Sequence, residues 1–282
     1  MLITRRLVIV LTGLMFSWSA AQATPMGIDA YWLSETTPAF APEADVIAIP
    51  PRPVVSIIID DVGYSRHADA FAASGLHLTY AILPHAPHSL RLARQLKQQN
   101  REVMLHLPMQ STLEQANRSP GLLVTGMNKP DFIQTLQYNL TELAPYIQGI
   151  NNHQGSMLSA DTVTMNWLME YLAEYNQTAV QPWYMVDSRT TTATVIEPLA
   201  RQHAVPTVRR HVFLDNQRDV AAIKQQVQKL LSKAQRQGYA VGIGHPYPET
   251  LQALQESVSE FQQQIDMVSV SQLIMIKSTL TQ

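Results

Sequence analysis

The chain contains no cysteine, and this absence excludes three kinds of site. Without thiols there is no disulfide framework, no cysteine nucleophile and no thiolate metal centre. An exported protein without disulfides must gain its stability from a substantial hydrophobic core. The 282 residues are enough for one large domain or two small ones.

An excess of positive charge is also lacking. The formal net charge is -2, and removal of Arg5 and Arg6 with the N-terminal segment (-2 minus 2) makes it -4. Binding of nucleic acid needs clustered basic charge, so we expect no nucleic-acid partner. The short Arg209-Arg210 pair is interpreted as an ordinary solvated or strand-end feature.

The apolar segment near the N-terminus is short for a membrane span. Leu7–Trp18 follows Arg5-Arg6 and precedes the A-x-A sequence Ala21-Gln22-Ala23, whereas a spanning helix needs about 20 apolar residues. This order predicts a signal peptide over residues 1–23, export, and no stable membrane span after cleavage. An uncleaved anchor is the alternative. Residues 24–53 are proline-rich without a sustained period, which predicts a disordered or extended linker.

Short β-rich runs alternate with helical stretches from Val54 onward. The alternation predicts a parallel sheet, and seven or eight such units favour a closed or nearly closed (β/α) barrel, with an open doubly wound sheet as the alternative. No G-x-G-x-x-G or P-loop motif follows the first strand, which weakens a nucleotide-binding interpretation. The predicted strands are Val54–Asp60, Leu78–Leu83, Glu102–Leu107, Gly149–Asn152, Trp183–Val186, Thr207–Phe213, Ala240–Gly244 and Met267–Val270. The predicted helices are Ser89–Gln99, Asp131–Leu143, a helix capped by Asp161 that runs through Tyr175, Ala221–Gln237 and Pro248–Gln264.

Residues with chemical capability gather at the predicted carboxyl ends of these strands. In a (β/α) barrel, function sits at this end. Independent helix-capping residues would more often be Ser, Thr or Asn, so the recurrence of Asp or His at consecutive strand ends favours one shared site. The residues, in chain order, are Asp60-Asp61, His106, Asn151-Asn152-His153, Asp187 with Ser188 and Arg189, Asp215 and His245.

The residue types at these strand ends favour a metal site. Carboxylates and imidazoles without thiolates suit zinc or another first-row divalent ion. A metal would also neutralise carboxylate charge at the end of a buried strand. Because adjacent strand residues face opposite ways, Asp60 and Asp61 can share one site only where the strand breaks, and Val62-Gly63 offers such a break.

Five ordered motifs carry a family resemblance: "IIIDDVGYS", "LHLPMQ", "NNHQGS", "VDSRT" and "GIGHP". They resemble the divergent polysaccharide deacetylases, the bacterial YibQ-like proteins, over about residues 54–277. The resemblance implies a NodB-like, distorted (β/α) barrel domain, which leaves residues 278–282 as a C-terminal tail. It also implies a relationship to metal-dependent carbohydrate esterases.

The resemblance implies roles for individual residues. By position, Asp60 matches the catalytic base and Asp61 a metal ligand, while His245 matches the late histidine that protonates the leaving amine or assists the oxyanion. His106 matches the first histidine of an H-x-x-x-H ligand segment, but Gln110 occupies the place of the second. A neutral amide oxygen is a poor zinc ligand beside imidazole, so His153 is the candidate replacement.

Further residues are expected to support the ligands or contact the substrate. Asp187 would orient a histidine or join the metal shell, and Arg189 would pair with Asp187 or meet an anionic substrate. Asn152, Gln110 and Asp215 complete this outer group.

The implied function is that of an exported, zinc-dependent deacetylase. A metal-activated water would remove acetyl groups from an N-acetylated envelope glycan such as peptidoglycan, in the periplasm. The main alternative is a catalytically inactive barrel that binds envelope glycan or a protein partner, and Gln110 is the feature in its favour.

Other hydrolase classes fit less well. A metal-dependent hydrolase of another amide or ester remains open. A serine hydrolase is disfavoured because no G-x-S-x-G elbow occurs. A glycosidase that uses Asp60 and Asp187 leaves the strand-end histidines without a role.

Overall fold

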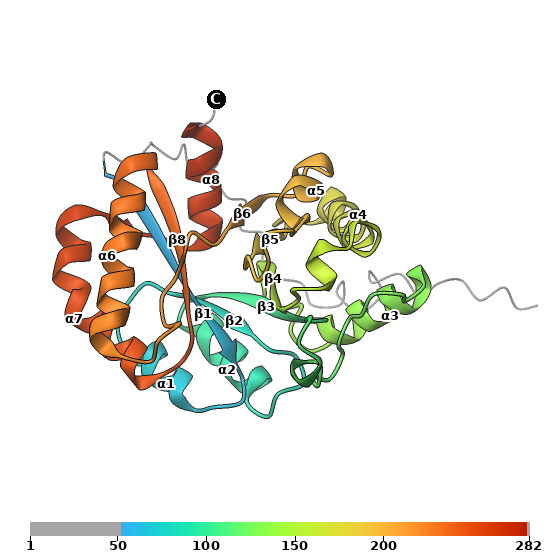
Figure 1. The fold of residues 1–282 in the computed structure, drawn as a ribbon, viewed down its shortest axis with the longest axis horizontal. Helices are drawn as coiled ribbons and strands as arrows, with labels where there is room; N and C mark the ends of the chain where they lie inside the picture. The colour runs from blue at the N-terminus through green and yellow to red at the C-terminus, as the bar shows by residue number, and fades with distance from the viewer. Residues whose placement is uncertain (1–51, 281–282) are drawn as a thin grey trace, which may run out of the picture. The chain divides into compact units, whose positions relative to one another are not determined.

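Parallel strands form the centre of the part of the chain that the structure, a computed structural model, describes (residues 52–280; Figure 1). The strands are β1 (Val54–Val62), β2 (Thr79–Ile82), β3 (Glu102–Met109), β4 (Gly149–Gln154), β5 (Tyr184–Asp187), β6 (Thr207–Arg209), β7 (Val212–Phe213), β8 (Tyr239–Gly244) and β9 (Asp266–Met267). The predicted signal peptide lies outside the described residues, as does all of the predicted linker except Arg52 and Pro53.

The strand order confirms the predicted distorted barrel and excludes the doubly wound alternative. The strands follow one another as β6-β5-β4-β3-β2-β1-β8-β7, and β9 pairs with the start of β1. A doubly wound sheet would reverse its order at a switch point, whereas here neighbours in the sheet are neighbours in sequence from β1 to β6. The eight strands of this path curl into an incomplete barrel.

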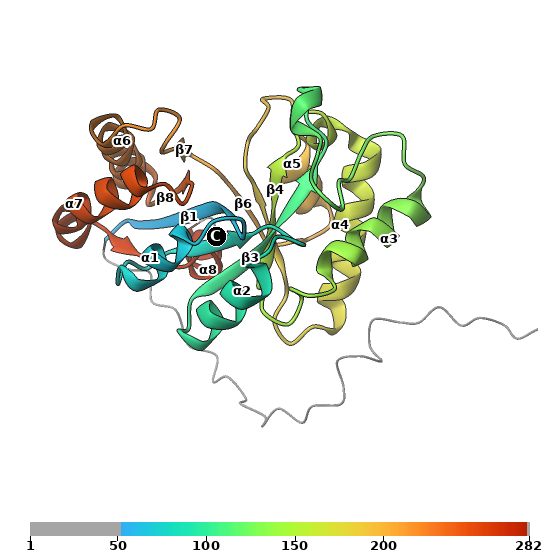
Figure 2. The ribbon, with the colours of Figure 1, turned by 90° about the horizontal axis from the view of Figure 1, so that it is seen from below.

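Helices cover the outer face of the sheet (Figure 2). They are α1 (His67–Ala73), α2 (Ser89–Gln98), α3 (Lys129–Leu140), α4 (Thr162–Thr178), α5 (Ile196–Gln202), α6 (Val220–Gln237) and α7 (Pro248–Gln264). α8 (Val270–Leu280) follows them, and two single turns of 3-10 helix lie at Glu114–Ala116 and Leu158–Ala160. No helix within residues 52–280 is both long and apolar enough to cross a membrane.

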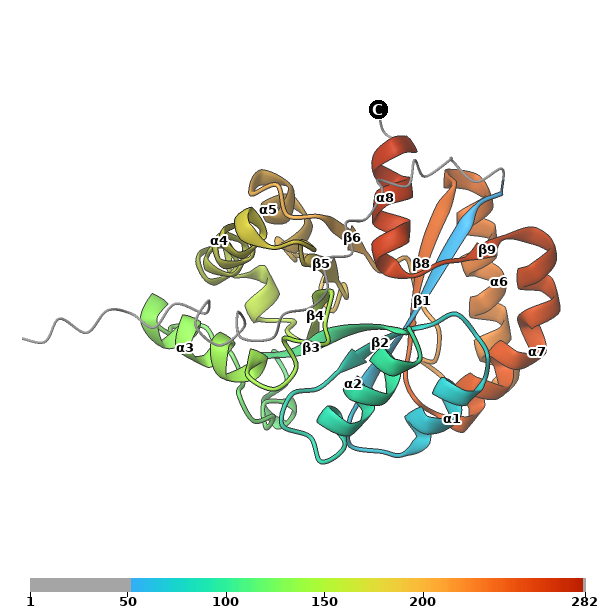
Figure 3. The ribbon, with the colours of Figure 1, turned by 180° about the vertical axis from the view of Figure 1, so that it is seen from behind.

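Both faces of β1 are buried, and alternate residues enter two separate cores. Val55, Ile57 and Ile59 pack in the larger core toward the outer helices. Val54 and Ile58 face the inner side, where residues of α8 complete a smaller core. Figure 3 shows α8 beside β8 and β6, so this last helix fills the inner face. Burial on both faces explains why β1 has no alternation of apolar and polar residues.

Predicted elements agree with the structure except near the end of the chain and in short helices. The predicted strand Met267–Val270 is wrong, because β9 ends at Met267 and Val270 begins α8. α8 continues to Leu280, so residues 278–280 are helical, whereas a tail was expected from residue 278. α8 itself was not predicted. The helices α1 and α5 were not predicted either, since seven residues give too little periodicity.

The predicted strand Thr207–Phe213 is divided into two strands. β6 pairs with β5, and β7 pairs with β8, with only Arg210 and His211 between them. The backbone N–H of Arg210 donates to Asp187 and that of His211 to Val241. Residues 207–213 therefore pair with the strands at both ends of the sheet, and we call this stretch the seam.

His211 in the seam is held neutral. Burial lowers its pKa, and the positive charges of Arg209, Lys233 and Lys277 lower it further against the opposing charge of Glu197, to about 4 from the ordinary value of 6.5. The backbone N–H of Val241 donates to its Nδ1 at 3.0 Å, which places the ring proton on Nε2.

Acid is therefore expected to destabilise the fold through His211. Between about pH 6.5 and pH 4 the unfolded chain binds a proton that the folded chain excludes, so stability falls as the pH falls. His211→Asn keeps an acceptor for Val241 and removes this titration. From pH 7 to pH 5 the wild type should lose about 2 kcal/mol more unfolding free energy than the variant, measured by urea denaturation. Equal losses in the two proteins would contradict a neutral His211.

Candidate metal and catalytic centre

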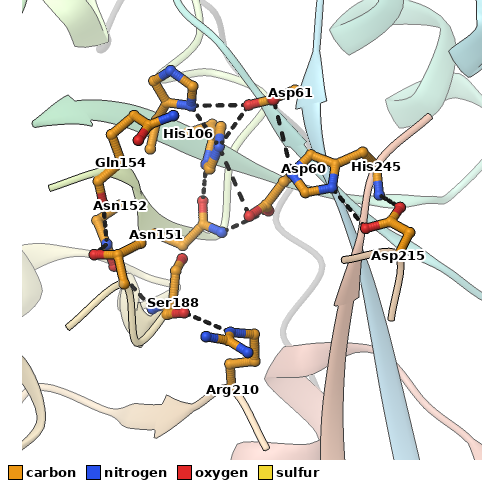
Figure 4. A network of polar contacts seen from close by, with 12 residues as sticks. Asp60, Asp61, His106, Asn151, Asn152, Gln154, Ser188, Arg210, Asp215 and His245 are labelled. Atoms are coloured by element: carbon orange, nitrogen blue, oxygen red, sulfur yellow. Dashed lines mark hydrogen bonds and ion pairs between the residues drawn. The ribbon is translucent and has the colours of Figure 1, made fainter. Parts of the chain in front are cut away.

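The carboxyl ends of the central strands bring the predicted residues together (Figure 4). Asp60 and Asp61 come from β1, His106 from β3 and His153 from β4, while His245 directly follows β8. Hydrogen bonds connect these groups although the bonded residues are 45 or more positions apart in the sequence. The centre thus depends on the register of the parallel strands.

A bulge in β1 turns both aspartates toward the centre. The register of β1 against β2 shifts between Ile59 and Val62, and Asp61 has a φ of 56°. This left-handed conformation is more accessible to Asp than to most residues. The break was expected at Val62-Gly63, but it lies one residue earlier, at Asp61 itself.

Three ligand atoms converge on one point. Oδ1 of Asp61 lies 3.1 Å from Nε2 of His106 and 2.9 Å from Nδ1 of His153, and the two ring nitrogens are 3.1 Å apart. One carboxylate and two imidazoles within 4.8 Å of one another could hold a metal ion. Oxygen and imidazole donors with open positions match the needs of a catalytic divalent metal, so the donor set fits.

The charges around His106 favour a cation at this point. Burial by itself lowers the pKa of His106, but the carboxylates of Asp60 and Asp61 outweigh it and raise the pKa to about 9. Burial likewise raises the pKa of Asp61, and the hydrogen bonds from His106 and His153 reverse this and hold it well below its usual range. The carboxylates of the centre therefore stabilise positive charge near the histidine nitrogens, as the carboxylates of a metal site do.

Asn151 is a residue of the centre whose role the sequence did not reveal. Its Nδ2 donates to Oδ1 of Asp60 at 2.8 Å, so its Oδ1 faces Nδ1 of His106, at 2.7 Å, as an acceptor. This places a proton on Nδ1 and turns Nε2 toward Asp61. The strand period of two could have indicated this role, because Asn151 lies on the same face of β4 as His153, whereas Asn152 lies on the other face.

Asp60 lies beside this cluster and is almost fully buried. Burial raises its pKa, against the opposing effects of His106, His245 and Asn151. Its Oδ2 is 3.8 Å from Nε2 of His106. A buried carboxylate with a raised pKa is a stronger base than an exposed one.

His245 lies on the other side of the cluster and is oriented by Asp215. Oδ1 of Asp215 accepts from Nδ1 of His245 at 2.9 Å, and Oδ2 accepts from the Thr250 hydroxyl at 2.7 Å. Nε2 of His245 is 3.8 Å from Oδ2 of Asp61. Burial lowers the pKa of His245, but the hydrogen bond and charge of Asp215 outweigh it and raise the pKa.

Asp187 was expected to orient a histidine or join the metal shell. Within residues 52–280 it forms no hydrogen bond or ion pair with a histidine, and it is not among the three converging ligand residues. Asp187 is fully buried at the end of β5 and accepts the backbone N–H of Arg189 at 2.8 Å. The orienting carboxylate is Asp215, two residues beyond β7. Strand β7 brings Asp215 next to β8, whereas β5 is separated from β8 by the seam.

Gln110 does not take the place of a ligand. Its Oε1 accepts from the backbone N–H and the hydroxyl of Thr125, at 2.8 and 2.9 Å. Both lone pairs of this oxygen are thereby used. His153, and not Gln110, stands beside His106.

Asn152 and Arg210 fix the loop after β5. Oδ1 of Asn152 accepts the backbone N–H of Ser188 at 2.8 Å. Arg210 donates to the carbonyls of Ser188 and Arg189, at 2.6 and 2.8 Å, as Figure 4 shows for Ser188. Arg210 directly follows β6, in keeping with the strand-end alternative, but its side chain is engaged by these carbonyl groups, and its charge also reaches Asp60 and Asp187.

A family model matches most of the chain. The family model described as divergent polysaccharide deacetylase matches residues 57–274. The chain belongs to the divergent polysaccharide deacetylase family. All the residues placed in the centre above lie within the matched range.

Two uncharacterized bacterial proteins are similar in sequence to this chain. A Haemophilus influenzae protein is 30% identical over 224 residues, covering 78% of this chain and 76% of the relative. The protein YibQ of Escherichia coli is 32% identical over 221 residues, covering 78% of this chain and 67% of YibQ.

Solved structures share the fold at low identity. An uncharacterized protein of Agrobacterium tumefaciens superposes with a TM-score of 0.73 at 19% identity, over 80% of this chain and 91% of that protein. A lactam utilization protein of Thermus thermophilus gives 0.53 at 14% identity, over 77% of this chain and 99% of that protein. At these identities the similarity concerns the fold alone.

Proposed function

We propose that this protein is a metal-dependent hydrolase that removes acetyl groups from an N-acetylated glycan. The observation that carries the proposal is the convergence of Asp61, His106 and His153, with Asp60 on one side and the His245–Asp215 pair on the other. Membership of the divergent polysaccharide deacetylase family supports the choice of an acetylated polysaccharide as substrate.

Asp61, His106 and His153 would hold the ion, for which zinc suits the donor set best. When bound, it would supply Lewis-acid stabilisation of the charge that develops on the acetamide carbonyl oxygen. Asn151 would keep Nε2 of His106 directed at the ion, as hydrogen-bond partners of metal-binding histidines do.

Asp60 and His245 would move the protons. As a water oxygen bonds to the carbonyl carbon, Asp60 accepts a proton from that water. As the C–N bond breaks, Nε2 of His245 gives a proton to the departing amine, and the Asp215 carboxylate stabilises the charged ring before transfer. The products are acetic acid and the free glycan amine. Asp60 ends the turnover protonated and His245 neutral, and proton exchange with solvent restores both groups.

The test of this proposal is acetate release. Purified protein loaded with zinc should release acetate and an equal amount of free glycan amine from N-acetylated oligosaccharides or peptidoglycan. A chelator should abolish the reaction, and added metal should restore it. Absence of acetate release from every acetylated glycan, with metal bound, would favour the inactive glycan-binding or partner-binding barrel.

The proposal includes export to the periplasm and an envelope glycan, such as peptidoglycan, as substrate. It rests on the order of basic, apolar and A-x-A segments in residues 1–23. Cleavage after Ala23 predicts a mature chain that begins at Thr24. N-terminal sequencing of the protein from the periplasmic fraction checks this, and a chain that keeps residues 1–23 would indicate an anchor.

A further inference from the structure

A basic cavity lies beside the seam. Its volume is about 450 Å³, and its lining includes the cationic side chains of Arg189, Arg209, Arg210 and Lys233. The threonines at positions 190–192 add hydroxyl groups, and no Asp or Glu of the described residues lines the cavity. Its volume is within the range of ordinary ligand pockets.

The positive charges of this cavity are incompletely balanced within the described residues. Neither Arg189 nor Lys233 forms an ion pair there, and the nearest carboxylate to Arg209 is Glu197, at 3.7 Å. Arg210 is fixed by its two hydrogen bonds to carbonyl groups, which leave its charge in place. Like charges gathered around one space repel one another, and an anion bound between them would relieve this repulsion.

His211, which is neutral, also lines this cavity. Burial is the main cause of its lowered pKa, but Arg209 and Lys233 on two different elements add to the effect. The neutral imidazole therefore lines the cavity without adding positive charge. Guanidinium, ammonium and hydroxyl donors together match the oxygens of a carboxylate or phosphate.

The cavity and the candidate metal centre share one loop. Arg189 and the threonines follow Ser188 directly, and Asn152 holds both the Ser188 backbone and, at 3.4 Å, the Thr190 hydroxyl. Asn152 stands between Asn151 and His153 of the centre in sequence. Arg210 lines the cavity, and its charge reaches Asp60. One ligand with two functional groups would be positioned by both sites.

We propose that the cavity binds the carboxylate or phosphate of an acidic glycan whose acetamide group lies at the Asp61–His106–His153 centre. The role of the cavity as a substrate subsite rests on the proposed deacetylase function, whereas the binding of the anionic group does not. Specificity for acidic over neutral acetylated sugars would follow from this arrangement.

Calorimetric titration of the purified protein with three sugars tests the proposal. N-acetylmuramic acid carries a carboxylate, N-acetylglucosamine 6-phosphate carries a phosphate, and N-acetylglucosamine is the neutral reference. Both acidic sugars should bind at least about fivefold more tightly than the reference, and the tighter of the two identifies the preferred group. Lys233→Gln and Arg209→Gln should each remove most of this preference.

Two further variants define where the anion binds. Lys229→Gln makes the same change of charge on the same helix, at an exposed position outside the cavity lining, and should keep the preference. Asp61→Asn should keep it also, because the anion is not held at the metal centre.

Three results would overturn the cavity proposal: equal binding of all three sugars, an intact preference in both cavity variants, or its loss in Asp61→Asn. Acetate release plays no part in this readout. A protein that prefers acidic sugars but releases no acetate would reject the hydrolase proposal and leave the anion site supported.

Discussion

Asp60→Asn should lower the rate of acetate release by ~10²–10⁴-fold, the usual contribution of a general base. The amide has the shape of the carboxylate, and its oxygen can still accept from Nδ2 of Asn151. It cannot take a proton from water at neutral pH. Because Asp60 is not among the three converging ligand residues, the metal content should stay at the wild-type level.

Stability measurements separate this loss from a folding defect. The substitution replaces a buried charged group by a neutral group of equal size, so the unfolding free energy should not fall. Asp69→Asn provides the matched change on α1, where Asp69 pairs with Arg91, and should keep full hydrolytic activity. An Asp60→Asn protein with more than about a tenth of wild-type activity would refute the assignment of the base.

His153→Ala should weaken metal binding by ~100-fold or more, whereas Gln110→Ala should leave it unchanged. Changes in groups that only support a ligand already cost about 10–100-fold in affinity, and removal of a ligand costs more. His153 is within 3.1 Å of both other candidate ligands, while Oε1 of Gln110 is engaged by Thr125. Competition with a chromophoric chelator measures both affinities.

The two variants should also differ in stability. Gln110→Ala removes the acceptor of the Thr125 backbone N–H and is expected to cost about 1 kcal/mol of unfolding free energy. Its metal content should nevertheless be full, which makes it the control for His153→Ala. The reverse pattern, with metal lost only in Gln110→Ala, would place the second ligand at position 110, as the H-x-x-x-H pattern of the family resemblance implies.

The sequence predicted the barrel because strand and helix periods are local properties. A buried run such as Val54–Asp60 favours a strand, and an amphipathic run such as Ala221–Gln237 favours a helix. Because such strands and helices alternate along the chain, the strands are expected to pair in parallel. The seam could not be predicted, since its division depends on two different neighbouring strands. The short helices α1 and α5 form by packing on the sheet, with too few residues for a periodic signal.

Choices between similar residues were decided by tertiary structure. Asp187 and Asp215 both follow predicted strands. Of β5 and β7, only β7 pairs with β8, so only Asp215 reaches His245. Arg209 and Arg210 are adjacent and look alike in sequence. The strand register nevertheless leaves Arg209 exposed and ties Arg210 to the carbonyl groups after β5.

The sequence by itself determined which strand ends have carboxylate and imidazole side chains, because residue types and strand periods can be read from it directly. Tertiary structure decided how those residues meet. The bulge at Asp61, the turn of Asn151 toward His106 and the position of His153 arise from pairing between strands far apart in the chain. Contacts of this kind depend on register and backbone conformation, which the local sequence does not specify.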